Sequence, residues 1–345
     1  MKNKAVVLTN LKTLEFRDVP MPEVKPDEIL LKLEAVGVCG SDVHYYEKGK
    51  IGDFVVEYPF ILGHECAGTV VEIGSEVKDL KVGDRVALEP GVPCGHCEMC
   101  RLGHYNLCKD VKFFATPPYN GCLMNYVSFP AEFAFKLPET MTAVEGALVE
   151  PLAIGINAAL TAGIKLGDTV MIFGAGCIGL VSLLSAKAFG ATKIIVSDII
   201  PKRLEVAEKL GAITINSSEK DVVSEVMSLT DGNGVDAVLD CAGFSETVRD
   251  STKVAKARGR IVVVGLGDDV INGISLSDLS VKELTLTSIF RYKNIYPTAI
   301  SSISSGKIDI GGIVSNTFKF EETPEAFRVA SECARDIVKS VIIFD

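Results

Sequence analysis

The sequence predicts a two-domain α/β protein in which a β-rich domain precedes a doubly wound domain with a parallel sheet. Three observations lead to this prediction. The chain has 345 residues, enough for about two domains of roughly 150 residues each. Its first part is rich in short β-prone runs bounded by Gly, Pro and Asp. Beyond about Gly167, strand-like and helix-like segments alternate, as they do in βαβ units.

The expected elements follow from these patterns in chain order. The β-rich part contains expected strands at 5–8, 28–35, 68–73 and 85–88. The second part contains expected strands at 169–173, 193–197, 237–241 and 260–264, and expected helices at 178–189, 201–210, 221–229 and 246–256. Residues 291–345 carry two helical stretches and strand-like runs at 317–320 and 341–344. This tail is too short for a third domain, so we expect one domain of residues 1–150 with 290–345 packed onto it, and a second of residues 151–289.

Composition excludes several classes of protein. Hydrophobic residues make up 48% of the chain and charged residues 23%, which is ordinary for a globular protein. The net charge of −10 argues against a nucleic-acid partner, because phosphates would be repelled. The start of the chain shows no signal-peptide pattern, and the longest uncharged stretch, 169–186, is interrupted by glycines and falls short of a membrane span. We therefore expect a cytoplasmic protein with no membrane partner.

A glycine motif opens the second domain. Gly174, Gly176 and Gly179 lie between an expected strand and an expected helix, and Asp198 ends the next strand. Such glycines let the backbone approach a pyrophosphate at a helix N-terminus. Asp198 can accept a hydrogen bond from a ribose 2′-hydroxyl and would repel a 2′-phosphate, which favours NAD over NADP. The alternative is an ordinary strand-to-helix turn beside a solvated aspartate.

Four of the ten cysteines are clustered, at Cys94, Cys97, Cys100 and Cys108. Four thiolates at this spacing can close a tetrahedral zinc site with no open position, which is the structural kind. An iron–sulfur run would have a shorter last gap followed by Pro. The alternative is a loop that carries reduced thiols.

A third set of candidate ligands is dispersed along the first domain: Cys39, His64, Glu65 and Glu150. One thiolate, one imidazole and one or two carboxylates can hold zinc and leave a position for water or substrate. Each residue alone is a weak signal. A single Cys is usually a small buried hydrophobe, and Glu150 is equally suited to the first turn of a helix.

Together these motifs resemble those of the zinc-dependent medium-chain alcohol dehydrogenases. The resemblance is closest to the sorbitol (L-iditol) and xylitol dehydrogenase branch, and it covers essentially the whole chain. It is carried by the glycine motif, the four cysteines and the segments 39–46, 63–65, 113–118, 149–152 and 290–292. The resemblance implies a GroES-like catalytic domain followed by a Rossmann domain, and a homotetramer that pairs through the last Rossmann strand, near 284–289.

The resemblance also implies the roles of the metal ligands. Cys39, His64 and Glu65 would hold a catalytic zinc, with Glu150 as a further ligand or as the holder of a zinc-bound water and proton acceptor. The four clustered cysteines would hold a structural zinc. The substrate proton would leave through Ser41 or the zinc-bound water, and His44 would pass it to solvent. For His44, a surface histidine without a role is an equally weighted alternative.

The substrate and cofactor positions follow in the same way. The resemblance implies a polyol that is oxidised to its ketose, with NAD as hydride acceptor. The residues implied in substrate contact are Tyr45, Phe113, Glu150, Arg291 and Tyr292, although core packing is the alternative for Tyr45 and Phe113. Those implied along the dinucleotide are Gly174, Gly176, Ile178, Gly179, Asp198, Arg203, Val264, Gly265, Leu266, Ile289, Phe290 and Arg291.

Three rival functions remain open. A threonine dehydrogenase and a sugar-alcohol-phosphate dehydrogenase of the galactitol-1-phosphate type share the zinc and glycine motifs. Threonine would need a partner for its carboxylate, and a phosphate would need more Lys or Arg near the cleft. A non-enzymatic zinc protein would be expected to lack residues apt for an open zinc site. Asn157 stands where relatives commonly have His, and Cys177 where Pro is frequent, but neither departure removes a ligand.

Overall fold

The computed structural model describes residues 2–332 and 337–345, and the chain divides into two compact units. The first comprises Met1–Glu150, Tyr296–Ser305 and Val314–Asp345, and the second comprises Pro151–Ile295 and Gly306–Ile313. Residues 290–295 and 306–313 thus group with the second unit, whereas the sequence analysis placed all of 290–345 with the first. None of the described helices is long and apolar enough to cross a membrane.

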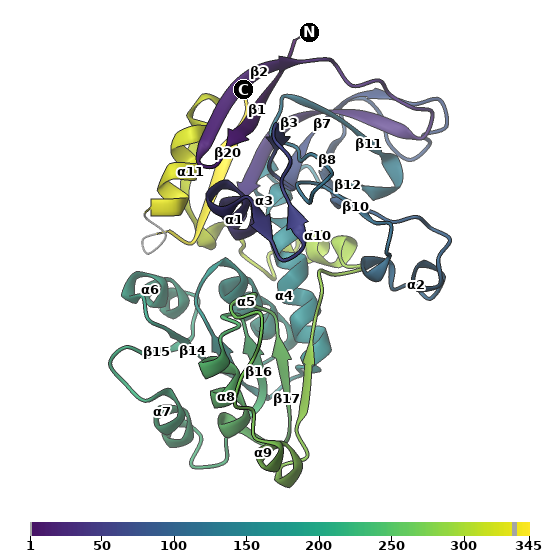
Figure 1. Cartoon of the computed structure of the whole chain (residues 1–345). Helices are drawn as coiled ribbons and strands as arrows, with labels where there is room; N and C mark the ends of the chain where they lie inside the picture. Colours follow the sequence, from purple (N-terminus) through teal and green to yellow (C-terminus); the bar gives the residue numbers. More distant parts are fainter. Residues whose placement is uncertain (1, 333–336) are drawn as a thin grey trace. The chain divides into compact units, whose positions relative to one another are not determined.

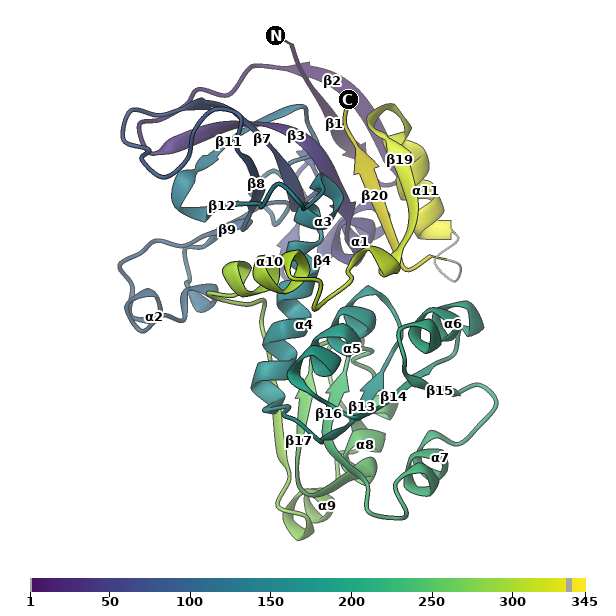
Figure 2. The ribbon, with the colours of Figure 1, turned by 180° about the vertical axis from the view of Figure 1, so that it is seen from behind.

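The first unit is built on a mixed seven-stranded sheet in which β3 is central (Figure 2). The strand order is β12-β8-β7-β3-β20-β19, and β11 also pairs with β3. The bounds in that order are Ala134–Lys136, Arg85–Leu88, Glu65–Ile73, Glu28–Val38, Lys339–Ile343 and Val314–Lys319, with β11 at Tyr126–Pro130. Because neighbouring strands flank it on both sides, β3 is almost wholly buried.

Smaller elements complete this unit. The short sheets are β2-β1-β6 (Thr13–Val19, Asn3–Asn10, Phe60–Ile61), β4-β5 (Lys50–Ile51, Phe54–Val55) and β10-β9 (Lys112–Phe113, Gly91–Val92). The helices are α1 (Gly40–Lys48), α2 (Glu98–Arg101), α3 (Ala143–Ala147), α10 (Tyr296–Ser304) and α11 (Thr323–Glu332). Helix α11 packs beside β19 and β20, so these elements from the end of the chain lie together on the central sheet (Figure 2).

The second unit is a six-stranded, wholly parallel sheet in the order β15-β14-β13-β16-β17-β18 (Figure 1). The bounds in that order are Ile213–Asn216, Lys193–Asp198, Thr169–Phe173, Val235–Asp240, Ala255–Val263 and Thr285–Ser288. Parallel strands end at one edge of a sheet, so the turns after β13, β14, β16 and β17 come together there. This edge is where the glycine motif lies.

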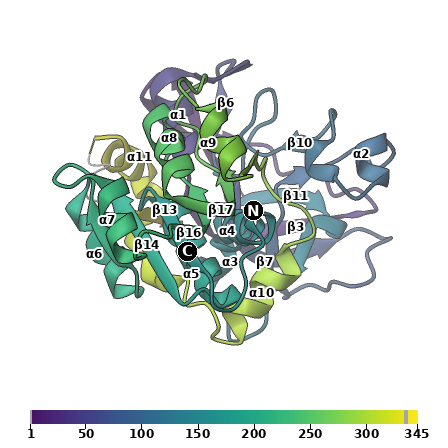
Figure 3. The same ribbon diagram turned by 90° about the horizontal axis from the view of Figure 1, so that it is seen from below.

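Helices cover both faces of the parallel sheet. They are α5 (Cys177–Phe189), α6 (Pro201–Lys209), α7 (Val222–Leu229), α8 (Ser245–Val254) and α9 (Leu276–Val281), and α4 (Val149–Ala162) spans the boundary between the units. Opposite views show α8 in front of the sheet in Figure 1 and α5 in front in Figure 2, and Figure 3 shows the two helices on opposite sides of the strands. The apolar core beneath α7 and α8 includes Val226, Val238 and Val254.

Local sequence signals explain several helix ends. Pro201 begins α6, and Asp221 caps α7 by accepting a hydrogen bond from the Ser224 amide at 2.8 Å. Gly190 ends α5 at φ +104°, a left-handed conformation that favours glycine.

Some expected boundaries were wrong. The helix expected to run to Lys256 ends at Val254, because Ala255 already pairs with Val235 as part of β17. Strand β7 begins at Glu65, three residues before the expected start, because its pairing with β3 continues to Gly37. The mostly exposed strand β2 was not predicted, and helix α4 was considered only as the alternative role of Glu150, which lies in its first turn.

Candidate metal and cofactor sites

Cys39, His64 and Glu65 meet where strands β3 and β7 of the first unit lie side by side. Cys39 follows β3 and is the N-cap residue of α1, while Glu65 begins β7 opposite Gly37. One donor atom from each of the three side chains lies within 4.8 Å of the other two. His64 is 6% exposed and Glu65 is 1% exposed. The fold therefore brings Cys39 beside the adjacent pair His64 and Glu65, and we call these three residues the catalytic cluster.

Asp42 orients the histidine of this cluster, and the sequence analysis missed it as a site residue. Its carboxylate is fully buried, and Oδ2 lies 3.4 Å from His64 Nδ1. The same carboxylate accepts hydrogen bonds from the amides of Gly63 (2.9 Å) and Cys39 (3.3 Å). Holding Nδ1 against a carboxylate leaves Nε2 available to a metal. The available signal was an acidic residue in the first turn of a helix that begins immediately after Cys39.

The electrostatics of the catalytic cluster favour a positive charge. Burial acts against a charged imidazole, but the nearby Asp42 and Cys39 outweigh it and raise the pKa of His64 well above its usual value. A cation bound among these groups would take the place of that proton.

The donor set fits a zinc ion. A thiolate, an imidazole and a carboxylate provide three protein ligands and leave a fourth position for water or substrate. Among the described residues, Glu150 does not belong to the group within 4.8 Å. It lies near the start of α4 and is 6% exposed. Glu65 is thus the carboxylate that the fold places beside Cys39 and His64.

The expected proton-transfer residues lie on α1. Ser41 and His44 are both half-buried and are separated by one helical turn. Burial lowers the pKa of His44, and the positive charge of Lys48 lowers it further. The lowered pKa of His44 favours the neutral imidazole, which suits a proton acceptor.

The two aromatic candidates of the first unit are both buried. Phe113 is 8% exposed, and its ring centroid lies 5.7 Å from that of His64. Tyr45 is 3% exposed and packs against Phe60 with ring centroids 6.4 Å apart. Phe113 thus borders the catalytic cluster, whereas Tyr45 contacts Phe60, and substrate contact by either residue stays a prediction.

Glu89 is a second buried acid that the sequence analysis missed. It follows β8, is 3% exposed, and accepts a hydrogen bond from the Tyr105 hydroxyl at 2.7 Å. Burial raises its pKa to about 7, and the negative charge of Glu150 contributes to the increase. Tyr105 belongs to the loop that carries the four clustered cysteines, so this hydrogen bond ties that loop to the sheet.

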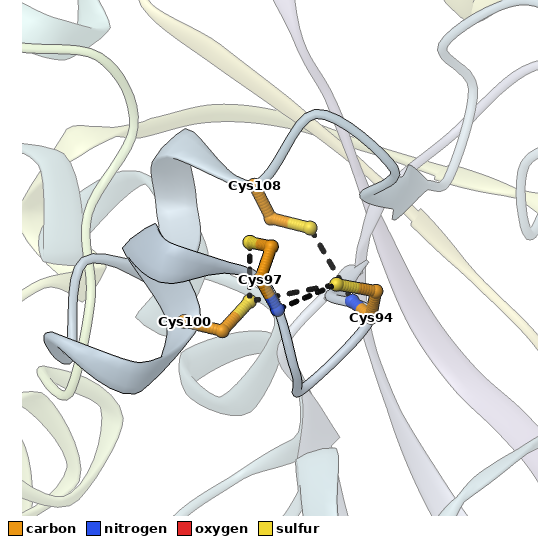
Figure 4. A group of neighbouring side chains, drawn as sticks. All are labelled: Cys94, Cys97, Cys100 and Cys108. Atoms are coloured by element: carbon orange, nitrogen blue, oxygen red, sulfur yellow. Dashed lines mark hydrogen bonds between the residues drawn. The ribbon is translucent and has the colours of Figure 1, made fainter.

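Cys94, Cys97, Cys100 and Cys108 converge on one point, with donor atoms all within 4.8 Å of one another (Figure 4). The sulfur atoms of Cys97 and Cys100 are 3.4 Å apart, and those of Cys94 and Cys100 are 4.0 Å apart. Amide hydrogen bonds from His96 and Cys97 lower the pKa of Cys94 to about 6, which favours its thiolate, whereas burial raises the pKa of Cys100 to about 12 and also raises that of Cys108. Four thiol groups with no open position match a structural zinc site.

A cavity of about 620 Å³ lies at the carboxyl edge of the parallel sheet in the second unit. Four predicted cofactor residues line it: Gly174, Gly176, Asp198 and Arg203. Gly174 has φ +91°, and a methyl group at Gly179 would overlap the Gly174 carbonyl oxygen. The glycines therefore permit the tight turn and the close helix approach that a dinucleotide site needs. The sequence analysis missed other lining residues, among them Lys220 and Phe244.

Asp198 holds this turn with its carboxylate. Oδ2 accepts a hydrogen bond from the Ala175 amide at 2.7 Å, and Oδ1 accepts one from the Ile200 amide at 2.9 Å. Arg203 Nη1 lies 4.0 Å from Oδ2. Asp198 thus links the glycine turn to the next strand and also lines the cavity.

Among the described residues, those that line the cavity do not include the remaining predicted cofactor residues. They are Ile178, Gly179, Val264, Gly265, Leu266, Ile289, Phe290 and Arg291. Residues 264–266 and 289 follow the ends of β17 and β18, so they lie along the same edge of the sheet. Leu266 is 90% exposed there.

Arg291 has a special backbone conformation in the second unit. Its φ is +56°, which is uncommon for a residue with a side chain. Asn157, which replaces a common His, donates a hydrogen bond to the Arg291 carbonyl at 2.8 Å. The guanidinium lies 4.8 Å from the ring centroid of Phe290, and the neighbouring Tyr292 is 3% exposed.

Comparisons with known proteins agree with these sites. The alcohol dehydrogenase GroES-like domain matches residues 25–139, and the zinc-binding dehydrogenase domain matches residues 177–305. The sorbitol dehydrogenase of Bacillus subtilis (strain 168) is 41% identical over 98% of this chain and 96% of its own length.

Two solved structures are similar over nearly their whole length. An Escherichia coli oxidoreductase/dehydrogenase of unknown specificity is 42% identical with a TM-score of 0.95 over the whole of both chains. A zinc-binding dehydrogenase from Sinorhizobium meliloti 1021, bound to NADP, is 35% identical with a TM-score of 0.92 over 99% of both chains.

These matches confirm the predicted architecture of a GroES-like domain followed by a Rossmann domain. They also show that the chain is an oxidoreductase acting on CH–OH groups, in a family that uses zinc and a nicotinamide cofactor. The chain belongs to the zinc-dependent medium-chain alcohol dehydrogenases, in the branch that contains sorbitol dehydrogenase.

Proposed function

We propose that the protein is an NAD-dependent polyol dehydrogenase that oxidises a substrate of the sorbitol, xylitol or L-iditol type at its second carbon to the ketose. The supporting observation is the catalytic cluster of Cys39, His64 and Glu65, in a chain 41% identical to a sorbitol dehydrogenase over nearly its full length. When bound, zinc supplies Lewis acidity toward the substrate hydroxyl and NAD accepts the hydride.

The chain's own residues would orient the substrate and remove its proton. The Ser41 hydroxyl would relay the substrate proton, accepting it while it gives its own proton to His44, which lies one turn further along α1, has a lowered pKa and would release the proton to solvent. Glu150, buried at the start of α4, acts as a further proton acceptor. Arg291 offers five fixed donors to a substrate with several hydroxyl groups, and Tyr292 lies beside it.

We propose NAD rather than NADP as the cofactor. Asp198 lines the cavity, and its negative charge would repel a 2′-phosphate. Arg203 and Lys220 line the same cavity, and the Sinorhizobium meliloti relative binds NADP. Turnover should therefore be compared with both nucleotides, and we expect kcat/KM to be higher with NAD.

We also propose that the four clustered cysteines hold a structural zinc and that the protein is a tetramer. The closed set of four thiols supports the metal. Within the described part of the chain, β18 is an edge strand that pairs on one side only, and exposed apolar residues of the same unit include Leu276 and Val281. Unpaired edges and exposed apolar side chains of this kind favour association with another copy of the chain.

The decisive experiment follows NADH formation with xylitol, sorbitol, threonine and galactitol 1-phosphate in parallel. Each reaction is repeated after treatment with a chelator. We expect NADH with a polyol, its loss after chelation and its return when zinc is restored.

Turnover of threonine alone would contradict the assigned role of Arg291 and Tyr292. Turnover of the phosphate ester alone would contradict a neutral polyol as substrate. No activity with any of the four, in protein that holds two zinc ions per chain, would overturn the proposed substrate class.

A further inference from the structure

Lys339, the first residue of β20, is a buried cation that the mechanism above does not use. It is 2% exposed, and buried lysines are rare unless they are paired. Its Nζ donates hydrogen bonds to Glu65 Oε1 at 2.6 Å and to the Val38 carbonyl oxygen at 3.1 Å. The same nitrogen lies 2.5 Å from Glu65 Oε2, but Oε2 accepts no hydrogen bond among the described residues.

The register of three neighbouring strands explains how these two side chains meet. Glu65 of β7 pairs with Gly37 of β3, and Ser340 of β20 pairs with Val38. Strand β3 therefore separates the strands that carry the acid and the base. The Glu65 side chain reaches toward Lys339 over Gly37, where no side chain blocks it. A methyl group at Gly37 would overlap Glu65 Oε2 and would lie 3.1 Å from Cδ.

This arrangement bears directly on the catalytic cluster. The ammonium contacts the carboxylate of one ligand and the carbonyl of the residue before another ligand, Cys39. It occupies Oε1 as a hydrogen-bond acceptor and gives the carboxylate a defined orientation. Groups that hold a metal ligand in this way typically change metal affinity by about 10- to 100-fold when they are removed.

We propose that Lys339 is a positioning residue for the metal: its ammonium holds the Glu65 carboxylate, which lies over Gly37, in the orientation that binds the ion. The inference rests on the proposed function only in requiring that Cys39, His64 and Glu65 hold a metal. Gly37 supports the same conclusion independently. A residue with a side chain at this position would overlap the Glu65 carboxylate in that orientation.

The test uses zinc release from the loaded protein to a chromogenic chelator. Wild type should release two zinc ions per chain in two phases, and the Cys39→Ser variant identifies the phase that belongs to the catalytic cluster. In Lys339→Met and Gly37→Ala that phase should be about 10- to 100-fold faster. Lys339→Arg should restore part of the retention, because it keeps the charge.

Two controls separate positioning from a loss of folding. The four-cysteine site serves as a control within each variant, because its release phase should not change. Gly40→Ala is the matched glycine control, since a methyl group there meets nothing within 4 Å beyond its two chain neighbours and the backbone of its own helix. It should release zinc at the wild-type rate.

The outcomes distinguish the inference from the proposed function. A wild-type chain that binds no zinc beyond the amount held by Cys39→Ser would overturn the proposed metal site itself. Two zinc ions with an unchanged rate in Lys339→Met would overturn only the role of Lys339. Equal acceleration of both phases would also overturn that role, because it would show a general loss of stability.

Discussion

Asp42 illustrates how single residues outside the ligand motif determine the geometry of the catalytic cluster. It bonds to two backbone amides and contacts His64, so it holds the imidazole between the end of β3 and the start of β7. A buried carboxylate with such partners both orients the ring and compensates the charge of a bound cation.

Asp42→Asn should weaken zinc binding at the catalytic cluster by about 10- to 100-fold. Asparagine can still accept the hydrogen bond from the Gly63 amide, so the fold should persist, but the negative charge beside His64 is lost. Competition with a chelator of known affinity measures the change. Asp53→Asn, in the exposed β4-β5 turn, is the control. Unchanged affinity in Asp42→Asn would show that the carboxylate does not support the ligand.

Glu89 leads to a prediction about pH. Burial raises its pKa from 4.5 to about 7 in the folded protein. Because the raised value favours the protonated folded state, the stability from Glu89 is fully present below about pH 4.5 and is lost as the pH rises to 7. Above pH 7 the ionised, buried carboxylate costs on the order of 3 kcal/mol.

Glu89→Gln should therefore raise the melting temperature more at pH 8 than at pH 5. Glutamine keeps an acceptor for the Tyr105 hydroxyl and removes only the ionisation. Differential scanning calorimetry of the zinc-loaded protein at both pH values measures the effect, with Tyr105→Phe as the variant that tests the hydrogen bond alone. An equal change at the two pH values would contradict the raised pKa.

At the scale of elements, the loop of residues 94–108 has little regular structure to hold it. It contains only the four-residue helix α2 and the short 3-10 turn Tyr105–Leu107. Four converging thiols and the hydrogen bond from Tyr105 to Glu89 are the features that organise it. A metal at the thiols would supply the cross-links that so short a helix lacks.

Cys100→Ser should lower the zinc content from two ions per chain to one and should reduce the melting temperature. The catalytic cluster should keep its zinc, because none of its ligands lies in this loop. Elemental analysis after gel filtration gives the stoichiometry, and limited proteolysis shows whether cleavage begins within 94–108. Cys177→Ser, outside both groups, is the control. Full zinc content in Cys100→Ser would contradict a site built from four thiolates.

At the scale of the whole molecule, the parallel sheet of the second unit ends in β18. Among the residues that the structure describes, only β17 pairs with this strand, so its other edge presents backbone groups without a strand partner there. Exposed apolar residues of the same unit include Leu266, Leu276 and Val281. Covering these surfaces with a second copy would remove apolar area from water.

Val281→Asp should shift the protein from a tetramer toward smaller species. Val281 is 82% exposed in the single chain, so the substitution should leave the fold of the chain intact, whereas a charge buried between copies is costly. Light scattering coupled to gel filtration gives the mass. Val82→Asp, at an exposed valine of the first unit, is the control. A wild-type protein that is already monomeric would refute the proposed assembly.

The sequence alone was sufficient for the two-part architecture and for naming the residues that the fold brings together as candidate metal ligands. Regular alternation in the second part predicted strands β13 and β14 and helices α5 and α6 to within a residue or two at each end. This prediction succeeded because apolar residues recur in characteristic patterns along parallel strands and along the helices that cover them. The clustered cysteines and the glycine motif could also be identified from the sequence, because the residues of each motif lie close together in the chain.

The contacts made across long separations were decided only by the tertiary structure. The sequence left Glu65 and Glu150 as alternative ligands, and strand pairing between β3 and β7 placed Glu65 beside Cys39. No local pattern connects Lys339 with Glu65 or Tyr105 with Glu89, because those contacts depend on the register of paired strands and the path of a loop. A motif can identify a ligand, but the residues that orient it are determined by packing.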